Sequence, residues 1–411
     1  MAPAATGRLP AAAAVGGLVV AVLPIGGWAG LAIVNAVLAA AAVVDWALAP
    51  SPARVGVERS LPAVVVLGAG ATVSWRLANP MVRRLRVGVA DELAPSLSAE
   101  RRRLWARLPP GGKVTVATSI RPQRRGRFTP TELVVRVVGP LGLVARQGRR
   151  RLPGVLRVYP PFASRDEAEL RINRARLLEV GLRSAQGRGG GTEFEALRDY
   201  TPDDEFRRMD WAATARAGKA VVRTYRAERN QTVLLLLDAG RVMAGRVAGV
   251  PRLEHAIDAV MMLTYVATRL GDRAGLVAFD REVRAVVPPG HTRAQLGRVT
   301  EAMFELEPQL VESDYRGAFV EALARFRRRS LLVVFSELAE QAVAETLLPA
   351  LPLICRDHLV VVAGVRDPDV ARWAAATPTE ASTAFRKAAA VAALEERRRL
   401  VARLRGLGAT V

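Results

Sequence analysis

Three acidic side chains stand where an apolar run of the sequence gives way to a loop. They are Asp238, Asp280 and Glu337. When such runs form parallel strands, their carboxyl ends meet at one edge of the sheet. Carboxylates gathered there could hold a divalent cation or act as acid and base. A hydrolase built on these acids would lack a nucleophile paired with a base. We therefore expect a non-enzymatic protein and keep an uncharacterised hydrolase as the weaker alternative.

Other reactive side chains are sparse. The single cysteine, Cys355, excludes an intrachain disulfide and a cysteine-based zinc site. The three histidines, His255, His291 and His358, are scattered, so neither a histidine metal site nor a Ser-His-Asp triad is supported. The glycine run 189–191 lacks the Lys-Ser/Thr of a phosphate-binding loop.

The segment 186–226 alternates acids, arginines and aromatic residues at high density. One interpretation is structural: bidentate pairs of arginine and carboxylate lock a loop into place. The other is a surface that binds a partner, and the spacing alone leaves both open. The candidate partner-binding residues are Glu193, Arg198, Tyr200, Asp204, Arg207, Asp210, Trp211 and Arg216.

Alternating apolar runs and amphipathic stretches position these groups. Residues 232–238 indicate a buried strand and 252–272 a helix with one apolar face that stops at Gly271. Further strands and helices alternate to the end of the chain, which predicts a doubly wound α/β sheet. Residues 377–405 predict a helix, and residues 409–411 resemble the opening of one more strand, so the last strand of the sheet could be missing or short.

The region before it has another pattern. Residues 71–78, 83–90, 114–120 and 132–138 alternate between apolar and polar side chains and are separated by turn signals. This spacing predicts a small antiparallel β-sandwich. We expect the fold class to be multidomain, with a transmembrane α-hairpin, this sandwich and a doubly wound α/β domain. The expected boundaries are 1–50, 51–162, 163–230 and 231–411.

The N-terminal stretch 10–44 carries no charged residue. It is longer than the roughly 20 residues of one membrane span. We interpret it as two transmembrane helices, at about 9–24 and 28–48. Arginines flank both ends, which places the soluble domains in the cytoplasm at the inner (plasma) membrane. A cleaved signal peptide fits poorly, because the apolar run is too long. A single tilted span, which would reverse the side, remains an alternative.

Residues 191–243 resemble the signature of the bacterial family called domain of unknown function 58. Its members show Glu-Phe-x-x-Leu-Arg-x-Tyr, Pro-Gly-Asp, Arg-x-Ile-Asp-Trp and an Ala-Arg pair, followed by a strand that ends in Asp. The chain departs from this pattern at Asp203, where the family has Gly, and at Met209. The matching positions are Glu193, Phe194, Leu197, Arg198, Tyr200, Pro202, Asp204, Arg207, Asp210, Trp211, Ala215 and Arg216.

The resemblance implies a MoxR-type AAA+ ATPase as a partner and a C-terminal domain similar to von Willebrand factor A. That fold can hold Mg²⁺ through Asp-x-Ser-x-Ser, a Thr from a loop and a later Asp. Here Gly and Val replace both serines, and Glu337 replaces the later Asp. Arg241 adds a cation that could pair with Asp238, and 312–314 is the nearest source of the loop ligand. We expect no cofactor and a degenerate site at Asp238 and Glu337 that disfavours Mg²⁺.

The formal net charge is +21, and all but three of the 60 basic residues are arginine. These arginines are dispersed over several apparent domains, which weakens the hypothesis that the protein binds nucleic acid. The leading hypothesis is a membrane-anchored adaptor or scaffold that works with the ATPase in protein maturation or complex assembly. Membrane lipid and other von Willebrand factor A-like proteins are further expected partners. A basic protein that binds a membrane surface or nucleic acid is the alternative.

Overall fold

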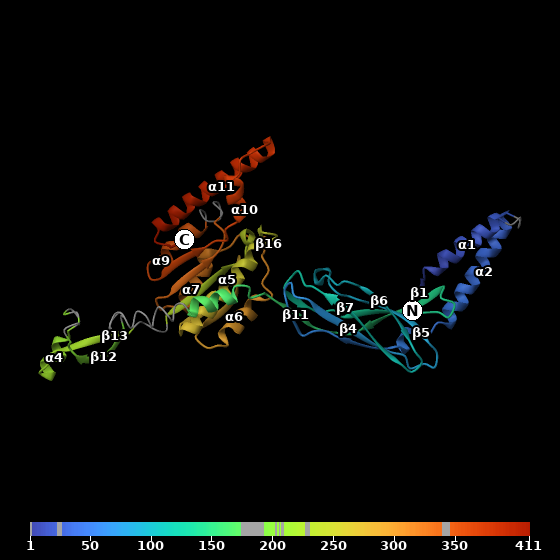
Figure 1. The fold of residues 1–411 in the computed structure, drawn as a ribbon, viewed down its shortest axis with the longest axis horizontal. Coiled ribbons are helices and arrows are strands. Elements are labelled where there is room, and N and C mark those ends of the chain that lie inside the picture. Colours follow the sequence, from blue (N-terminus) through green and yellow to red (C-terminus); the bar gives the residue numbers. More distant parts are fainter. Residues whose placement is uncertain are drawn as a thin grey trace. The chain divides into compact units, whose positions relative to one another are not determined.

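The computed structural model describes residues 2–22, 27–173, 193–201, 204, 206, 209–226, 231–338 and 346–411. The chain forms two compact units, Met1–Pro161 and Phe162–Val411 (Figure 1). The first unit holds two apolar helices and a β-rich body. The second holds an α/β domain and the small motif formed by residues 193–226, which is called the signature motif below.

Helices α1 (Arg8–Val22) and α2 (Gly27–Leu48) lie side by side (Figure 1). Gly16 permits the close approach, because a Cβ there would lie 2.5 Å from Val34 Cγ1. In the described part of the chain, α2 belongs to the one helix long and apolar enough to cross a membrane. The predicted apolar helices are therefore present, whereas the turn expected between them falls on residues 23–26, outside the described ranges.

The β-rich body follows the predicted alternation. In β4, Val73, Trp75 and Leu77 are buried in the core while the intervening side chains are more exposed. Three sheets surround this core, in the orders β1-β10-β9-β5-β6, β2-β4-β7 and β3-β11-β8. All pairings are antiparallel except that of β11 with β3. The strands are β1 (Ala2–Ala5), β2 (Gly56–Ser60), β3 (Val64–Val66), β4 (Ala71–Ala78), β5 (Leu85–Asp91), β6 (Arg103–Leu108), β7 (Lys113–Ile120), β8 (Gly126–Phe128), β9 (Glu132–Val138), β10 (Val144–Arg151) and β11 (Leu156–Tyr159).

Both ends of the helix pair are attached to this body. Before α1, strand β1 pairs with β10, although the sequence did not predict a strand there. At the end of α2, the fully buried Asp45 accepts hydrogen bonds from the backbone N–H groups of Leu141, Leu143 and Val144 at 2.7–2.8 Å. A Cβ at Gly139 would collide with the Asp45 carboxylate, so this loop needs glycine there. The two attachments fix where the helix pair leaves the body.

The α/β domain is built on one five-stranded sheet in the order β18-β17-β14-β19-β20, with only β18 antiparallel. This is the 3-2-1-4-5 order of a doubly wound sheet. Alternate residues of the central strand point to opposite faces. Leu235 packs against α5 and α6, and Leu234 lies in the core with α7, α9 and α11. The elements are β14 (Thr232–Asp238), α5 (Arg252–Leu270), β17 (Arg273–Phe279), β18 (Val283–Gly290), α6 (Gln295–Met303), α7 (Tyr315–Arg325), β19 (Leu331–Phe335), α9 (Leu348–Cys355), β20 (Leu359–Ala363), α10 (Pro368–Ala375) and α11 (Ala381–Gly406). A short β-ribbon of β15 (Arg246–Val247) and β16 (Val250–Pro251) precedes α5.

The predicted C-terminal helix is α11, which begins at a capping box formed by Glu380 and Thr383. After it, Thr410 forms a parallel bridge to Val361 of β20. Its backbone accepts from Val362 N and donates to Val360 O, both at 2.8 Å. The additional strand expected from residues 409–411 is therefore present as a single bridge.

Candidate functional site

The Asp238 carboxylate lies at the carboxyl end of the central strand β14 and is fully buried. Its Oδ1 accepts from the Ser313 hydroxyl at 2.5 Å and from Gly240 N at 2.8 Å. Its Oδ2 accepts from the Tyr315 hydroxyl at 2.7 Å and the Ser336 hydroxyl at 2.6 Å. Four donors from three loops therefore surround one carboxylate, and we call this group the Asp238 cage.

The Asp238 cage does not fit a divalent cation. Mg²⁺ requires near-octahedral oxygen ligands and several of its own waters, whereas the Asp238 oxygens are filled by protein donors. Burial, reinforced by the charge of Asp238, raises the pKa of Tyr315 well above its usual range, so its hydroxyl stays a proton donor. A Cβ at Gly240 would collide with the Ser313 hydroxyl, which shows how tightly the loop closes. Among the described residues, no group of three or more His, Cys, Asp or Glu could hold a metal.

Glu337, the second predicted metal ligand, has two cationic partners instead. Its Oε1 accepts from Arg397 Nη1 at 2.9 Å, and its Oε2 lies 3.2 Å from Arg252 Nε. The Glu337 side chain is buried, and both arginines are about a quarter exposed. Arginine therefore neutralises the carboxylate that would have to complete a cation site.

Two other sequence expectations need correction or refinement. Arg241 does not pair with Asp238; it forms an exposed ion pair with Glu312. Its side chain leaves the loop toward solvent, because the Asp238 oxygens are already occupied by hydroxyl and backbone donors. Asp280 is buried and accepts from Arg284 Nε at 2.7 Å. The three acids thus each have their own donors, and in the described residues they do not converge with a nucleophile and a base.

The signature motif consists of β12 (Glu193–Asp199), α4 (Trp211–Ala217) and β13 (Val221–Arg226), with β12 and β13 antiparallel. Two acid–arginine pairs hold it together. Arg198 donates hydrogen bonds to both carboxylate oxygens of Asp204. Its Nη1 lies 2.7 Å from Oδ2, and its Nη2 donates to Oδ1. Arg198 also holds the pKa of Asp204 down at about 2. These contacts are those expected from the structural interpretation of the segment.

Asp210 joins the helix to the strand. Its Oδ1 caps α4 by accepting from Ala213 N at 3.0 Å, and its Oδ2 accepts from Arg223 Nε at 2.7 Å. The Arg223 guanidinium, followed by the backbone N–H of Ala213, lowers the pKa of Asp210. Asp210 is therefore a structural residue of the motif, and its negative charge also suits a helix N-terminus.

Two aromatic side chains of the motif, those of Trp211 and Phe206, face solvent. Trp211 is 60% exposed and Phe206 is 64% exposed, and their rings meet edge to face with centroids 5.4 Å apart. Leu197 is 44% exposed. We call Trp211 and Phe206 the aromatic patch. Of the exposed apolar side chains, the sequence pointed to Trp211 but not to Phe206 or Leu197, since its periodicity could not show that these side chains are exposed.

The remaining predicted partner-binding residues have different positions. Tyr200 is partly buried, and its backbone N–H donates to Ala220 O at 2.9 Å. Arg216 is exposed in the last turn of α4. Glu193 begins β12 opposite Arg226. Arg207 lies outside the described residues.

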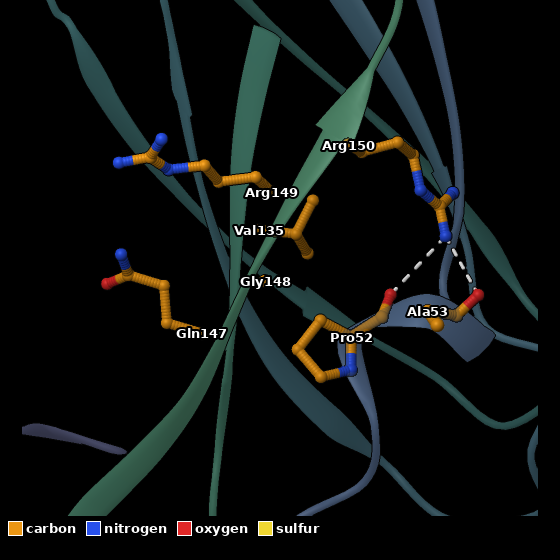
Figure 2. A pocket seen from close by; sticks show the side chains of 7 residues that line it. All are labelled: Pro52, Ala53, Val135, Gln147, Gly148, Arg149 and Arg150. Carbon is orange, nitrogen blue, oxygen red and sulfur yellow. Dashed lines mark hydrogen bonds between the residues drawn. The ribbon is translucent and has the colours of Figure 1, made fainter. Parts of the chain in front are cut away.

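The β-rich body contains a cavity between β10 and the segment that follows α2. Its volume is about 490 Å³, and it is lined by Pro52, Ala53, Val135 and residues 147–150 (Figure 2). Figure 2 shows Arg150 turned toward the backbone, where its Nη2 donates to Ala53 O at 2.8 Å. No acid, histidine or nucleophile lines the cavity, so it offers no acid–base pair for catalysis.

Comparison with known proteins supports the family resemblance. Residues 196–385 match the family described as protein of unknown function DUF58. The uncharacterized protein Rv1480 of Mycobacterium tuberculosis (strain ATCC 25618 / H37Rv) is 30% identical over 152 residues, or 36% of this chain and 48% of the relative. The uncharacterized protein Mb1516 of Mycobacterium bovis (strain ATCC BAA-935 / AF2122/97) matches to the same extent. The chain thus spans about half the length of these relatives.

Among solved structures, the CARDB domain of PF1109 from Pyrococcus furiosus is 16% identical, with a TM-score of 0.18. That match covers 26% of this chain and 94% of the domain.

Proposed function

We propose that this protein is a membrane-anchored, non-enzymatic adaptor that docks a partner protein through the aromatic patch. The observation that carries the proposal is the exposure of Trp211 and Phe206 on a motif whose elements are joined by ion pairs. Exposed aromatic side chains on a fixed scaffold are typical binding hot spots, because they bury a large area at little entropic cost. The Asp238 cage and the paired Glu337 support a binding role rather than a catalytic one.

The proposed partner is a MoxR-type AAA+ ATPase, in protein maturation or complex assembly. This choice follows from the resemblance to the domain of unknown function 58 family. The α/β domain is proposed to be von Willebrand factor A-like, which its 3-2-1-4-5 strand order supports. In this proposal the domain contributes a metal-free surface, since hydroxyl donors occupy the place of a cation at Asp238.

The proposed anchor is a hairpin of α1 and α2 in the inner (plasma) membrane, with the remaining domains in the cytoplasm. The 22 residues of α2 rise about 33 Å and the 15 of α1 about 22 Å, against a hydrocarbon core of about 30 Å. Attachment of both helix ends to one β-rich body supports a hairpin over a single span, because a single span would separate them. The flanking Arg8 and Arg54 support the cytoplasmic side.

Co-purification tests the docking proposal. We expect the double substitution Phe206→Ala/Trp211→Ala to lower recovery of the ATPase about tenfold or more, since one hot-spot residue contributes 2 kcal/mol or more. Phe385→Ala is the matched control, because Phe385 is 77% exposed on α11. Equal recovery with both variants, at unchanged circular dichroism, would refute docking through the aromatic patch. Asp210→Ala is unsuitable here, because it also removes the cap of α4.

A further inference from the structure

A second cavity in the β-rich body is markedly basic. Its volume is about 620 Å³, within the range of small-molecule sites. Five arginines line it, and no acidic side chain does. All five arginines are exposed. They are Arg8, Arg83, Arg84, Arg86 and Arg107.

The cavity lies beside the first residue of α1 and the segment that follows α2. Arg8 is the first residue of α1, and Pro50, which also lines the cavity, follows α2 by two residues. Arg83 reaches the end of α2 and donates from Nη2 to Leu48 O at 2.7 Å. Arg86 and Arg107 face each other in register across β5 and β6. Residues from both helix ends and from the body therefore share one basic pocket.

The charges of this pocket are not neutralised within the described part of the chain. There, none of the five arginines has a carboxylate oxygen within 4.0 Å. The acid near the pocket wall is Asp45, beside Gly139, and both its oxygens are engaged by backbone N–H groups. Arg86 stacks over the Trp105 ring at 5.2 Å, which orients its guanidinium without cancelling its charge. An anion would relieve the mutual repulsion of these arginines.

We propose that this pocket binds the phosphate headgroup of an anionic glycerophospholipid. Guanidinium groups bind phosphate oxygens in a bidentate manner. Basic pockets beside membrane helices are suited to anionic headgroups at the cytoplasmic leaflet. A nucleic acid is the less suitable ligand, because it needs an extended basic stripe, whereas these five arginines gather around one pocket. The inference rests on the proposed membrane anchor, since the anchor brings the pocket to headgroup level.

The test uses the full-length protein in nonionic detergent, incubated with equal amounts of phosphatidylglycerol and phosphatidylcholine. Native mass spectrometry then counts the lipids that remain bound. We expect about tenfold enrichment of phosphatidylglycerol, and its loss in Arg84→Gln/Arg107→Gln. The control Arg102→Gln/Arg127→Gln removes two exposed arginines that do not line the pocket, and it retains the enrichment.

Three further measurements separate the possible outcomes: competition by glycerol phosphate, competition by DNA, and carbonate extraction. Glycerol phosphate and a short DNA duplex are added as competitors, and displacement of the lipid by either at equal concentration would overturn the lipid assignment. Equal enrichment in the pocket variant and the wild type would overturn the pocket. Alkaline carbonate extraction of native membranes tests the anchor separately. Release of the wild type by carbonate overturns anchor and inference together, whereas retention without lipid preference overturns the inference alone.

Discussion

The buried Asp238 carboxylate is surrounded by hydrogen-bond donors of the protein itself. A buried charge is costly unless hydrogen bonds satisfy it. Here three hydroxyls and one backbone N–H supply those bonds, and they come from residues 75 to 98 positions away as well as from the adjacent loop. The sequence showed the loss of the two serines expected after Asp238. It could not show that Tyr315 and Ser336 replace them, because only the fold brings these loops together.

Removing one hydroxyl from the Asp238 cage should destabilise the α/β domain. Tyr315→Phe leaves Oδ2 of Asp238 with one donor fewer, so we expect a loss of about 1 to 3 kcal/mol in unfolding free energy. Chemical denaturation measures it. Tyr265→Phe is the control, because its hydroxyl contacts an exposed Glu169 at 3.1 Å. A loss in Tyr315→Phe no greater than in the control would contradict the cage.

At the level of the elements, the sequence predicted those whose pattern is long and regular. Strand β14 and helix α5 lie where their periodicity placed them. In the β-rich body only β4, β5, β7 and β9 were predicted as strands. Strands β1 and β10 are among those missed, because β1 has only four residues and β10 carries four arginines within eight positions. Their pairing depends on partners far along the chain. The junction between α2 and the body was invisible for the same reason, since Asp45 receives its donors from residues 141–144.

Loss of the Asp45 carboxylate should therefore loosen the junction of helix and body. Asp45→Ala leaves three backbone N–H groups without their acceptor, which we expect to cost about 3 to 5 kcal/mol. Asp45→Asn keeps one acceptor oxygen and should lose less. Thermal unfolding of the detergent-solubilised full chain measures both. Glu58→Ala, at a carboxylate whose side chain is 75% exposed, is the control, and equal melting of it and Asp45→Ala would contradict this role.

At the scale of the whole molecule, the two compact units carry different features. The first unit joins the apolar helix pair to the β-rich body and carries the basic pocket. The second unit carries the α/β sheet with the Asp238 cage and the signature motif, whose acid–arginine pairs join its elements and whose aromatic patch is exposed. The sequence anticipated this pairing as one of two interpretations. The structure supports it for Arg198, Asp204 and Asp210, so the proposed contact with a partner moves to Trp211 and Phe206.

Site-specific photo-crosslinking in living cells tests the central claim most directly. A photoreactive amino acid in place of Trp211 should crosslink the full-length protein to the MoxR-type ATPase, because this side chain is proposed to lie in the interface. The same amino acid in place of Phe385, which is also exposed, should give no such product. Mass spectrometry of the crosslinked band identifies the partner. A product containing the ATPase from position 211 alone is the predicted result, and its absence from position 211, or equal yield from both positions, would contradict the account.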